Sequence, residues 1–329
     1  QKEIEEMPAY EFEETQAVWI SYIDLSSMIS QDKSLTVLNF EKMIENCKKL
    51  NINTLYVHAS AFTDAYYESD YYPKAKVLKS INDLDPLKEI CSLAKKEGIK
   101  VEAWINPFRS FLRADMEELD DHYLLKKWVN DKEKNGKLIV EVNGRYYLNP
   151  YYEECRDLIK NVATELLEKY EISGIHMDDY FYPDGIDESF DASAYQSYLS
   201  KGGTLELKEF RKENVNKVVK ELYDCVKSHD SNKIFGISPA GNISYSINSI
   251  YGDVKEWVQN PGYIDYIAPQ IYFGFQHQTL DFVSCLNEWK ALIQNPDVEL
   301  IVGLAAYKMN EVDNYAGSGK NEWIEDREV

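Results

Sequence analysis

The sequence lacks several features that would assign it to a class at once. No run of about 18 consecutive apolar residues occurs, so no segment is suited to cross a membrane as a helix. Basic residues are scarce, because 36 Lys and Arg stand against 57 Asp and Glu and give a formal net charge of -21. No local basic patch offsets this charge, so the phosphate backbone of a nucleic acid would be repelled.

Motifs of several enzyme classes are also absent. The five cysteines include no Cys-x-x-Cys pair and match no zinc spacing, and their odd number cannot pair fully, so we expect buried core thiols. No Gly-x-Ser-x-Gly elbow is present. His58, His176 and His277 reach strand ends or rims, but no His-x-His or His-Glu-x-x-His spacing supports a metal site. We therefore predict neither a metal nor a cofactor.

What the sequence does contain is an alternation of short β-rich runs with amphipathic helical stretches, which is typical of parallel sheets with helical crossovers. The predicted strands cover residues 18–23, 53–58, 100–105, 174–178, 233–238, 265–271 and 299–304. Helical spacing predicts helices within residues 37–50, 86–97, 150–167, 207–226 and 282–289, the second capped by Asp85 and the third by Asn149-Pro150.

Seven such units in one chain predict a TIM (β/α)8 barrel over residues 15–329. An open doubly wound sheet is the alternative, but no Gly-x-Gly-x-x-Gly follows the first strand. Residues after Leu304 offer no eighth strand, so we expect this chain to stop before the barrel is complete. A long insertion, residues 107–149, follows the third strand and contains a hairpin at Asn143-Gly144. Residues 1–14 hold six glutamates and are expected to be disordered, after removal of a leader.

The end of the fourth strand is the richest in chemistry, and in a barrel the reactive groups lie at the C-terminal strand ends. Alternation along the strand places His176 one layer below Asp178, and Asp179 and Tyr180 follow in the turn. Two adjacent carboxylates can differ in pKa, as acid/base chemistry on a glycosidic bond requires. The simpler alternative, that Asp178 or Asp179 caps the following turn, is less favoured at a strand end surrounded by aromatic residues.

The third strand places Glu102, Trp104 and Asn106 on one face, with Asn106 at the rim and Glu102 deepest. Glu102 is a catalytic candidate, although a buried Glu needs a partner and a structural bond, for example with His176, is the stronger interpretation. Arg109 in the following loop could hold a carboxylate or hydroxyl group.

Other strand ends carry neutral polar groups beside aromatic rings, which suits sugars, whose hydroxyls take hydrogen bonds and whose C–H faces lie on rings. With 25 Tyr and 6 Trp in the chain, we expect an aromatic lining for an elongated sugar site. The predicted substrate-binding residues are His58, Trp104, Asn106, Arg109, His176, Tyr180, Asn242, Gln270, Tyr272, Tyr307 and Lys308.

Seven motifs, in this order, make the chain similar to the glycosyl hydrolase-like 10 family of bacterial cell-envelope proteins. They are Val18-Trp-Ile, Ala103-Trp-Ile-Asn-Pro-Phe-Arg109, Tyr147-Leu-Asn-Pro150, Gly174-Ile-His-Met-Asp-Asp-Tyr-Phe-Tyr-Pro183, Gly236-Ile-Ser-Pro239, Asp265-Tyr-Ile-Ala-Pro-Gln-Ile-Tyr272 and Gly303-Leu-Ala-Ala-Tyr-Lys308. The resemblance implies a TIM barrel, an extracytoplasmic protein that is secreted or attached to the cell surface, and a polysaccharide ligand, with peptidoglycan glycan strands as the leading candidate. It also implies that Asp178 and Asp179 form the catalytic element.

Two functional hypotheses follow. The first is a glycoside hydrolase with two-carboxylate chemistry, in which Asp178 is nucleophile or base and Asp179 or a loop acid such as Asp64 is its partner; retention or inversion of configuration stays open. The second is a glycan-binding barrel without hydrolysis, because residues 236–242 after the fifth strand contain no Glu, the usual general acid of α-amylase-like barrels.

Overall fold

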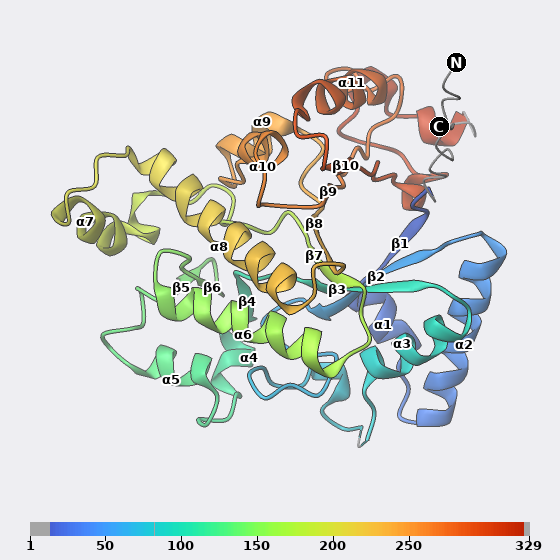
Figure 1. The fold of residues 1–329 in the computed structure, drawn as a ribbon, viewed down its shortest axis with the longest axis horizontal. Helices are drawn as coiled ribbons and strands as arrows, with labels where there is room; N and C mark the ends of the chain where they lie inside the picture. Colours follow the sequence, from blue (N-terminus) through green and yellow to red (C-terminus); the bar gives the residue numbers. More distant parts are fainter. Residues whose placement is uncertain (1–13, 82, 326–329) are drawn as a thin grey trace, which may run out of the picture.

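The computed structural model describes residues 14–81 and 83–325 of the chain. Its centre is a sheet of seven strands that follow one another in chain order, and every neighbouring pair is parallel. Figure 1 shows these strands turning around a common axis into part of a barrel. The strands are β1 (Ala17–Ile20), β2 (Thr54–Ser60), β3 (Lys100–Ile105), β7 (Gly174–Met177), β8 (Ile234–Ile237), β9 (Tyr266–Ile267) and β10 (Glu299–Leu300). This order confirms the barrel class and the seven predicted strands, because a doubly wound sheet would reverse its strand order at a switch point.

The five predicted helices are confirmed, and they lie outside the curled sheet (Figure 1). They are α2 (Lys33–Lys49), α3 (Pro86–Lys96), α6 (Glu153–Lys169), α8 (Leu207–His229) and α11 (Phe282–Leu292). Asp85 caps α3 as predicted, since its side chain accepts the Lys88 N–H at 3.0 Å. The predicted cap of α6 is wrong: this helix begins at Glu153, and the Asn149 side chain accepts the Tyr151 N–H in the turn before it.

The first predicted strand is too long, because a helix follows it directly. β1 ends at Ile20, and Ser21 caps α1 (Tyr22–Met28) in a reciprocal bond with Asp24, the Ser-x-x-Asp signature of a helix start. The other elements that the periodicity did not reveal are short. They are α4 (Arg113–Glu117), α5 (Leu124–Asn130), α7 (Ala192–Ser200), α9 (Ile243–Asn248), α10 (Val254–Gln259), α12 (Glu322–Glu325) and the 3₁₀ turns Lys76–Leu78, Glu188–Phe190, Ala306–Lys308 and Gly317–Gly319.

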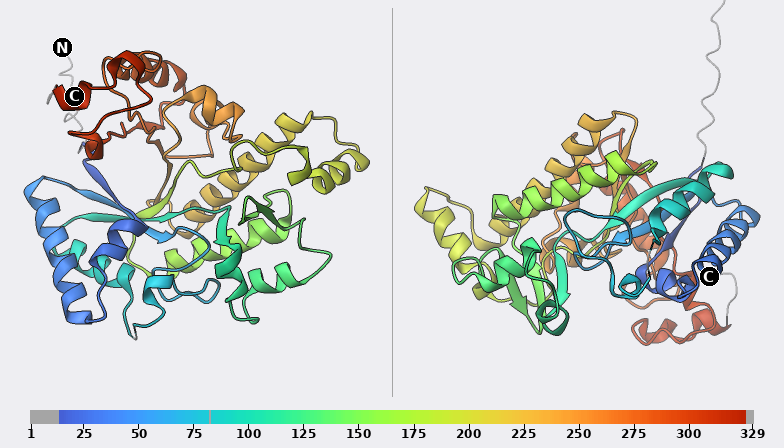
Figure 2. Two further views of the ribbon diagram at one scale, coloured as in Figure 1. Left: turned by 180° about the vertical axis from the view of Figure 1, so that it is seen from behind. Right: turned by 90° about the horizontal axis from the view of Figure 1, so that it is seen from below.

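The insertion after β3 forms a small antiparallel sheet of its own, beside the ends of the barrel strands (Figure 2). The predicted hairpin is confirmed as β5 (Ile139–Val142) and β6 (Arg145–Leu148), with Asn143 and Gly144 both at positive φ in the turn. β4 (Arg109–Leu112) adds a third strand by pairing with β6. In this pairing Arg109 is opposite Tyr147 and Arg145 is opposite Leu112, so the two arginines lie on neighbouring strands.

Two predictions concern the ends of the chain, namely a missing eighth strand and a disordered N-terminal segment. From residue 301 to residue 325 the structure contains short helices and turns but no strand, so the described sheet is open between β1 and β10. Within the same described part of the chain, no helix combines the length and the hydropathy that a membrane span requires. The predicted disordered segment, residues 1–14, lies outside the described residues except for Glu14.

The interior of the barrel is packed with aromatic rings in place of the usual aliphatic layers. The ring of Tyr56 stacks on His176 with 4.1 Å between centroids, and Trp19 and Tyr266 adjoin the same pair. Gly236 makes this possible, since a Cβ at that position would lie 2.0 Å from the ring of Tyr266. The five cysteines all lie in helices and carry free thiols, and four of them are buried, as predicted for core residues.

Candidate active site

Asp178 and Asp179 follow β7 directly and lie at the mouth of the barrel. Asp178 is 8% exposed, whereas Asp179 and Tyr180 are progressively more accessible. The Asp178 carboxylate accepts the backbone N–H of Asp179 at 2.8 Å, and the two carboxyl groups are close enough to shift each other's pKa. The strand therefore delivers two carboxyl groups as one pair, with only the second open to solvent.

Gln270 follows β9 in the chain, two residues after Ala268. Its side chain holds the carboxyl pair in position. Its Nε2 donates to Asp178 Oδ1 at 2.7 Å and to the backbone carbonyl of Ser238 at 3.0 Å. Because Ser238 follows β8, the amide ties together the ends of three neighbouring strands. The predicted contact of Gln270 with the site is thus a contact with the carboxyl pair.

Burial and mutual repulsion favour a proton on the pair. The pKa of Asp178 is raised well above its usual range, first by burial and then by the negative charge of Asp179. Burial also raises the pKa of Asp179, while its hydrogen bonds with Asp178 and Gln270 and the cation of Arg109 oppose that rise. These shifts favour retention of a proton by the pair under conditions in which a solvated Asp would be ionised.

His58, Trp104 and Asn106 form one wall of the mouth. The rings of His58 and Trp104 are stacked at 3.4 Å between centroids, and Asn106 lies 3.3 Å from both His58 Nε2 and Trp104 Nε1. His58 Nδ1 accepts the Tyr22 backbone N–H at 3.0 Å, and burial lowers the pKa of His58, which favours the neutral ring. These three predicted residues are brought together in the structure.

His176 and Glu102 belong to a hydrogen-bonded chain beneath the mouth. The Trp19 indole donates to His176 Nε2 at 3.0 Å, so the neutral imidazole donates from Nδ1 to the Tyr266 hydroxyl at 2.6 Å. That hydroxyl donates to Glu102 at 2.7 Å. The predicted partnership of Glu102 with His176 is therefore indirect, and Tyr266 is the link that the sequence did not reveal.

The depth of Glu102 separates it from the carboxyl pair. Glu102 is opposite Gly174 in the β3–β7 register, four residues before Asp178, which corresponds to about 13 Å along the strand. Burial raises the pKa of Glu102 to about 8, and burial lowers that of His176 to about 3. Both groups are uncharged and bonded internally at neutral pH, so Glu102 plays no part in the mechanism proposed below.

The rim of the mouth is aromatic and cationic. The Arg109 guanidinium lies over the Tyr180 ring, 4.3 Å from its centroid, and Tyr272 meets Tyr307 edge-on at 5.9 Å. Burial and the charge of Asp178 raise the pKa values of Tyr180 and Tyr272, which indicates that both phenols face the carboxyl pair. Tyr307, at 69% exposed, projects farthest into solvent.

Three other candidates are occupied by bonds within the protein. Lys308 Nζ pairs with Asp313 and donates to the carbonyl of Tyr272, both at 2.7 Å. Asn242 caps α9 by accepting the Tyr245 N–H. Asp64 accepts the N–H groups of Ala61 and Phe62 in the loop after β2. Each of them positions a loop of the mouth, and none is free to move toward the carboxyl pair.

The structure adds residues that the sequence did not single out. Phe62, from the loop after β2, and Arg145, from β6, reach the Arg109 side of the mouth. A small cavity of about 190 Å³ beside Asp179 is bordered by Asp184 and Tyr245. Alternation of side chains along the hairpin could have shown on which face of the small sheet Arg145 lies. Its contact with Phe62, however, depends on how the insertion packs. No cluster of three or more His, Cys, Asp or Glu suited to a metal occurs in residues 14–81 and 83–325.

A parallel barrel with carboxyl groups at the C-terminal ends of its strands has the arrangement in which enzymes of this fold place their reactive groups. Comparison with known sequences narrows this class. The chain belongs to the glycosyl hydrolase-like 10 family, whose profile matches residues 14–320.

Relatives and solved structures agree with this placement. Glycosyl hydrolase YngK of Bacillus subtilis strain 168 is 28% identical over 337 residues, which cover 94% of this chain and 64% of YngK. Glycosyl hydrolase DigH of Escherichia coli K12 is 26% identical over 89% of this chain and 70% of DigH. The chain thus spans about two thirds of the length of these relatives. The glycoside hydrolase domain of PgaB (BpsB) from Bordetella bronchiseptica shares the fold, with a TM-score of 0.63 at 12% identity over 88% of this chain and 84% of that domain.

Proposed function

We propose that the protein is a glycoside hydrolase and that Asp178 and Asp179 carry the proton transfer. The observation on which this rests is the carboxyl pair at the mouth of the barrel, held by Gln270 at 2.7 Å. Family membership and the names of YngK and DigH support hydrolysis of a glycosidic bond as the reaction type.

The pair is suited to act as a general acid. Cleavage of a glycosidic bond requires a proton on the departing oxygen, and a carboxyl group whose pKa is raised still holds one near neutral pH. Asp178 holds the proton, and Asp179, the more accessible member, lies between it and solvent. In this scheme the proton passes through the pair to the leaving oxygen, and Gln270 keeps Asp178 in place.

The second reacting group has to come from elsewhere in the cleft or from the substrate. Two carboxyl groups that flank a glycosidic bond are about 5 to 9.5 Å apart. Asp178 and Asp179 are adjacent in the chain, and Asp178 accepts the backbone N–H of Asp179, so in this scheme the two carboxyl groups act together on one side of the bond. Residues 236–242 contain no Glu, so the second reacting group cannot be a Glu of this segment.

The substrate that we propose is a polysaccharide, with the glycan strands of peptidoglycan as the first candidate and an extracytoplasmic location to match. The three rim tyrosines Tyr180, Tyr272 and Tyr307 offer ring faces to sugar units. Asn106 and His58 are polar and lie beneath this rim, where they bond each other and the protein around them.

The test is incubation with purified glycan strands, with and without stem peptides, followed by measurement of new reducing ends. Wild-type protein should release them, and Asp178→Asn should lower the rate by 10²- to 10⁴-fold, the usual contribution of a general acid. Asp297→Asn, at an exposed site, is the matched control and should keep full activity. No cleavage of any strand by the wild type, together with unchanged binding by Asp178→Asn, would favour the second candidate, a glycan-binding barrel without hydrolysis.

A further inference from the structure

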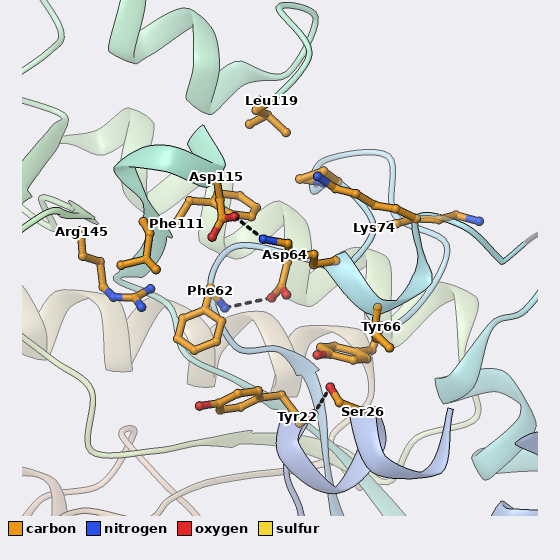
Figure 3. Close-up of a pocket in the computed structure, with 15 residues that line it drawn as sticks. Tyr22, Ser26, Phe62, Asp64, Tyr66, Lys74, Phe111, Asp115, Leu119 and Arg145 are labelled. Carbon is orange, nitrogen blue, oxygen red and sulfur yellow. Dashed lines mark hydrogen bonds and ion pairs between the residues drawn. The ribbon is translucent and has the colours of Figure 1, made fainter. Parts of the chain in front are cut away.

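A cavity of about 240 Å³ lies beside the candidate active site, between α1, the loop after β2 and the sheet of the insertion (Figure 3). Its walls include the rings of Tyr22, Phe62, Tyr66 and Phe111 and the guanidinium of Arg145. In Figure 3 the Arg145 side chain extends toward the ring of Phe62. The cavity thus combines aromatic faces, which suit a sugar ring, with a positive charge.

Two arginines meet at this place. The guanidinium carbons of Arg109 and Arg145 lie 4.8 Å and 4.6 Å from the centroid of the Phe62 ring, so less than twice that distance separates them. Burial lowers the pKa of Arg145, and the nearby cation of Arg109 lowers it further. The two guanidinium groups are held near each other because both pack against the ring of Phe62.

Neither guanidinium has a carboxylate in direct contact within the described part of the chain, although the charges of Asp179 on Arg109 and of Asp64 and Asp115 on Arg145 act at longer range. Among the residues that the structure describes, no carboxylate oxygen lies within 4.0 Å of Arg109 or Arg145, although the chain carries a net charge of -21. Arg145 Nη1 donates to the Ser110 carbonyl at 2.6 Å. The lysines at the rim differ, since Lys74 pairs with Glu68 and Lys76 with Asp115. The unused guanidinium donors therefore invite an anion from outside the protein.

The cationic cluster is continuous with the carboxyl pair. Arg109 contacts Phe62 on one side and Tyr180 on the other, and Tyr180 follows Asp179 in the chain. A ligand that extends from the carboxyl pair past Tyr180 would reach Phe62 and Arg145 next. We propose that Arg109, Phe62 and Arg145 form a subsite that binds a carboxylate-bearing sugar unit of the glycan. This subsite rests on the proposed function, since the same glycan is cut at the neighbouring pair.

The ligand chemistry follows from the geometry. A guanidinium binds a carboxylate through two parallel N–H···O bonds, and the ring of Phe62 provides an apolar face for the sugar that carries it. Both a lactyl carboxylate on a peptide-free peptidoglycan strand and the carboxylate of a uronic acid have this chemistry. The two sources differ in the position of the carboxylate on the ring, so both belong in the test.

Binding is best measured in the Asp178→Asn background, so that no strand is cut. The probes are peptide-free glycan strands, the same strands with their carboxyl groups esterified, a neutral chitin oligosaccharide and a uronic acid oligomer. The strands with free carboxylates should bind about 10-fold more tightly than the esterified ones, and Arg145→Gln should remove that preference. Arg145→Lys keeps the charge and should retain most of it, and Arg113→Gln, an exposed arginine paired with Glu141, should behave as the parent.

The uronic acid oligomer identifies the source: tight binding of this oligomer alone assigns the subsite to uronic acids, and tight binding of the strands assigns it to lactyl groups. Equal affinity for free and esterified strands and for the oligomer, or an equal loss with Arg145→Gln on the charged and neutral probes, would overturn the subsite. Cleavage by the wild type is measured separately. A carboxylate preference without cleavage would reject the hydrolase and keep the subsite, and cleavage without preference would do the reverse.

Discussion

Replacing Glu102 by glutamine should stabilise the protein in alkaline solution and weaken the dependence of its stability on pH. Glu102 is 3% exposed and accepts the Tyr266 hydroxyl at 2.7 Å inside the barrel. Burial raises its pKa to about 8, and the Tyr266 hydrogen bond offsets only part of that rise. At pH 9 the folded protein must therefore hold a buried charge that glutamine would not carry.

The sign and size follow from proton linkage. Because the folded state binds this proton more tightly than the unfolded state, the contribution of Glu102 is fully present below pH 4.5 and is lost as the pH rises to about 8. A rise in pKa from 4.5 to about 8, at 1.36 kcal/mol for each pH unit, corresponds to about 5 kcal/mol between pH 4 and pH 9. Asp178 changes stability in the same direction, so the quantity to measure is the difference between variant and wild type.

The assay is urea unfolding at pH 5, 7 and 9 for the wild type, Glu102→Gln and the control Glu133→Gln, whose side chain is 86% exposed. The free energy of unfolding of Glu102→Gln should exceed that of the wild type by several kcal/mol at pH 9, and the gap should shrink toward pH 5. Glu133→Gln should follow the wild type throughout. Parallel pH curves for Glu102→Gln and the wild type would refute a buried carboxyl with a raised pKa.

Three further outcomes are expected. Gly236→Ala should lower the free energy of unfolding by about 1–3 kcal/mol in urea, because its Cβ would lie 2.0 Å from the Tyr266 ring; an unchanged midpoint would show that the ring can move aside. Asp191→Ala should cost about 3–5 kcal/mol in the same assay, since it leaves the buried Arg211 guanidinium without its carboxylate, and a loss below about 1 kcal/mol would contradict this. The kcat/KM for a soluble glycan should persist through neutral pH and fall as the pH rises through the upper pKa of the Asp178–Asp179 pair; a rise in that range would exclude the pair as general acid.

The layers of the barrel interior could be predicted from the sequence because side-chain direction alternates along a strand. That rule alone puts Asp178 above His176 and Asn106 above Trp104 and Glu102, and the structure has this order in both strands. A different rule, that reactive groups lie at the C-terminal strand ends of a barrel, chose the carboxyl pair among 57 acidic residues. The position of a residue along one strand is a local property, and such properties can be predicted from the sequence.

Contacts between strands were not readable to the same degree. Nothing near Glu102 or His176 in the sequence indicates that Tyr266 bonds both of them. Lys308 was expected to meet a ligand, but Asp313, five residues later, holds its ammonium group. Partners of long side chains depend on loop conformation, and loops carry little periodic signal.

The tyrosine surplus shows most clearly what composition cannot decide. Tyrosines clustered beyond strand ends were expected to line a sugar site, yet five of them, Tyr66, Tyr67, Tyr72, Tyr146 and Tyr182, are at most 7% exposed. Their rings pack against the loops around the mouth. A buried phenol can still form a hydrogen bond through its hydroxyl, as Tyr67 does by donating to Glu165 at 3.0 Å.

In a chain with a net charge of -21, this pairing has a second effect. The buried carboxylate of Glu165 accepts hydrogen bonds from two neutral donors, Tyr67 and Ser69, and pairs with Lys169. Such a carboxylate needs few basic side chains as partners. Arginines can then stay without a direct ion pair, as Arg109 and Arg145 do against Phe62. In the subsite that we propose, the abundant tyrosines would thereby help to leave the two arginines for an anionic ligand.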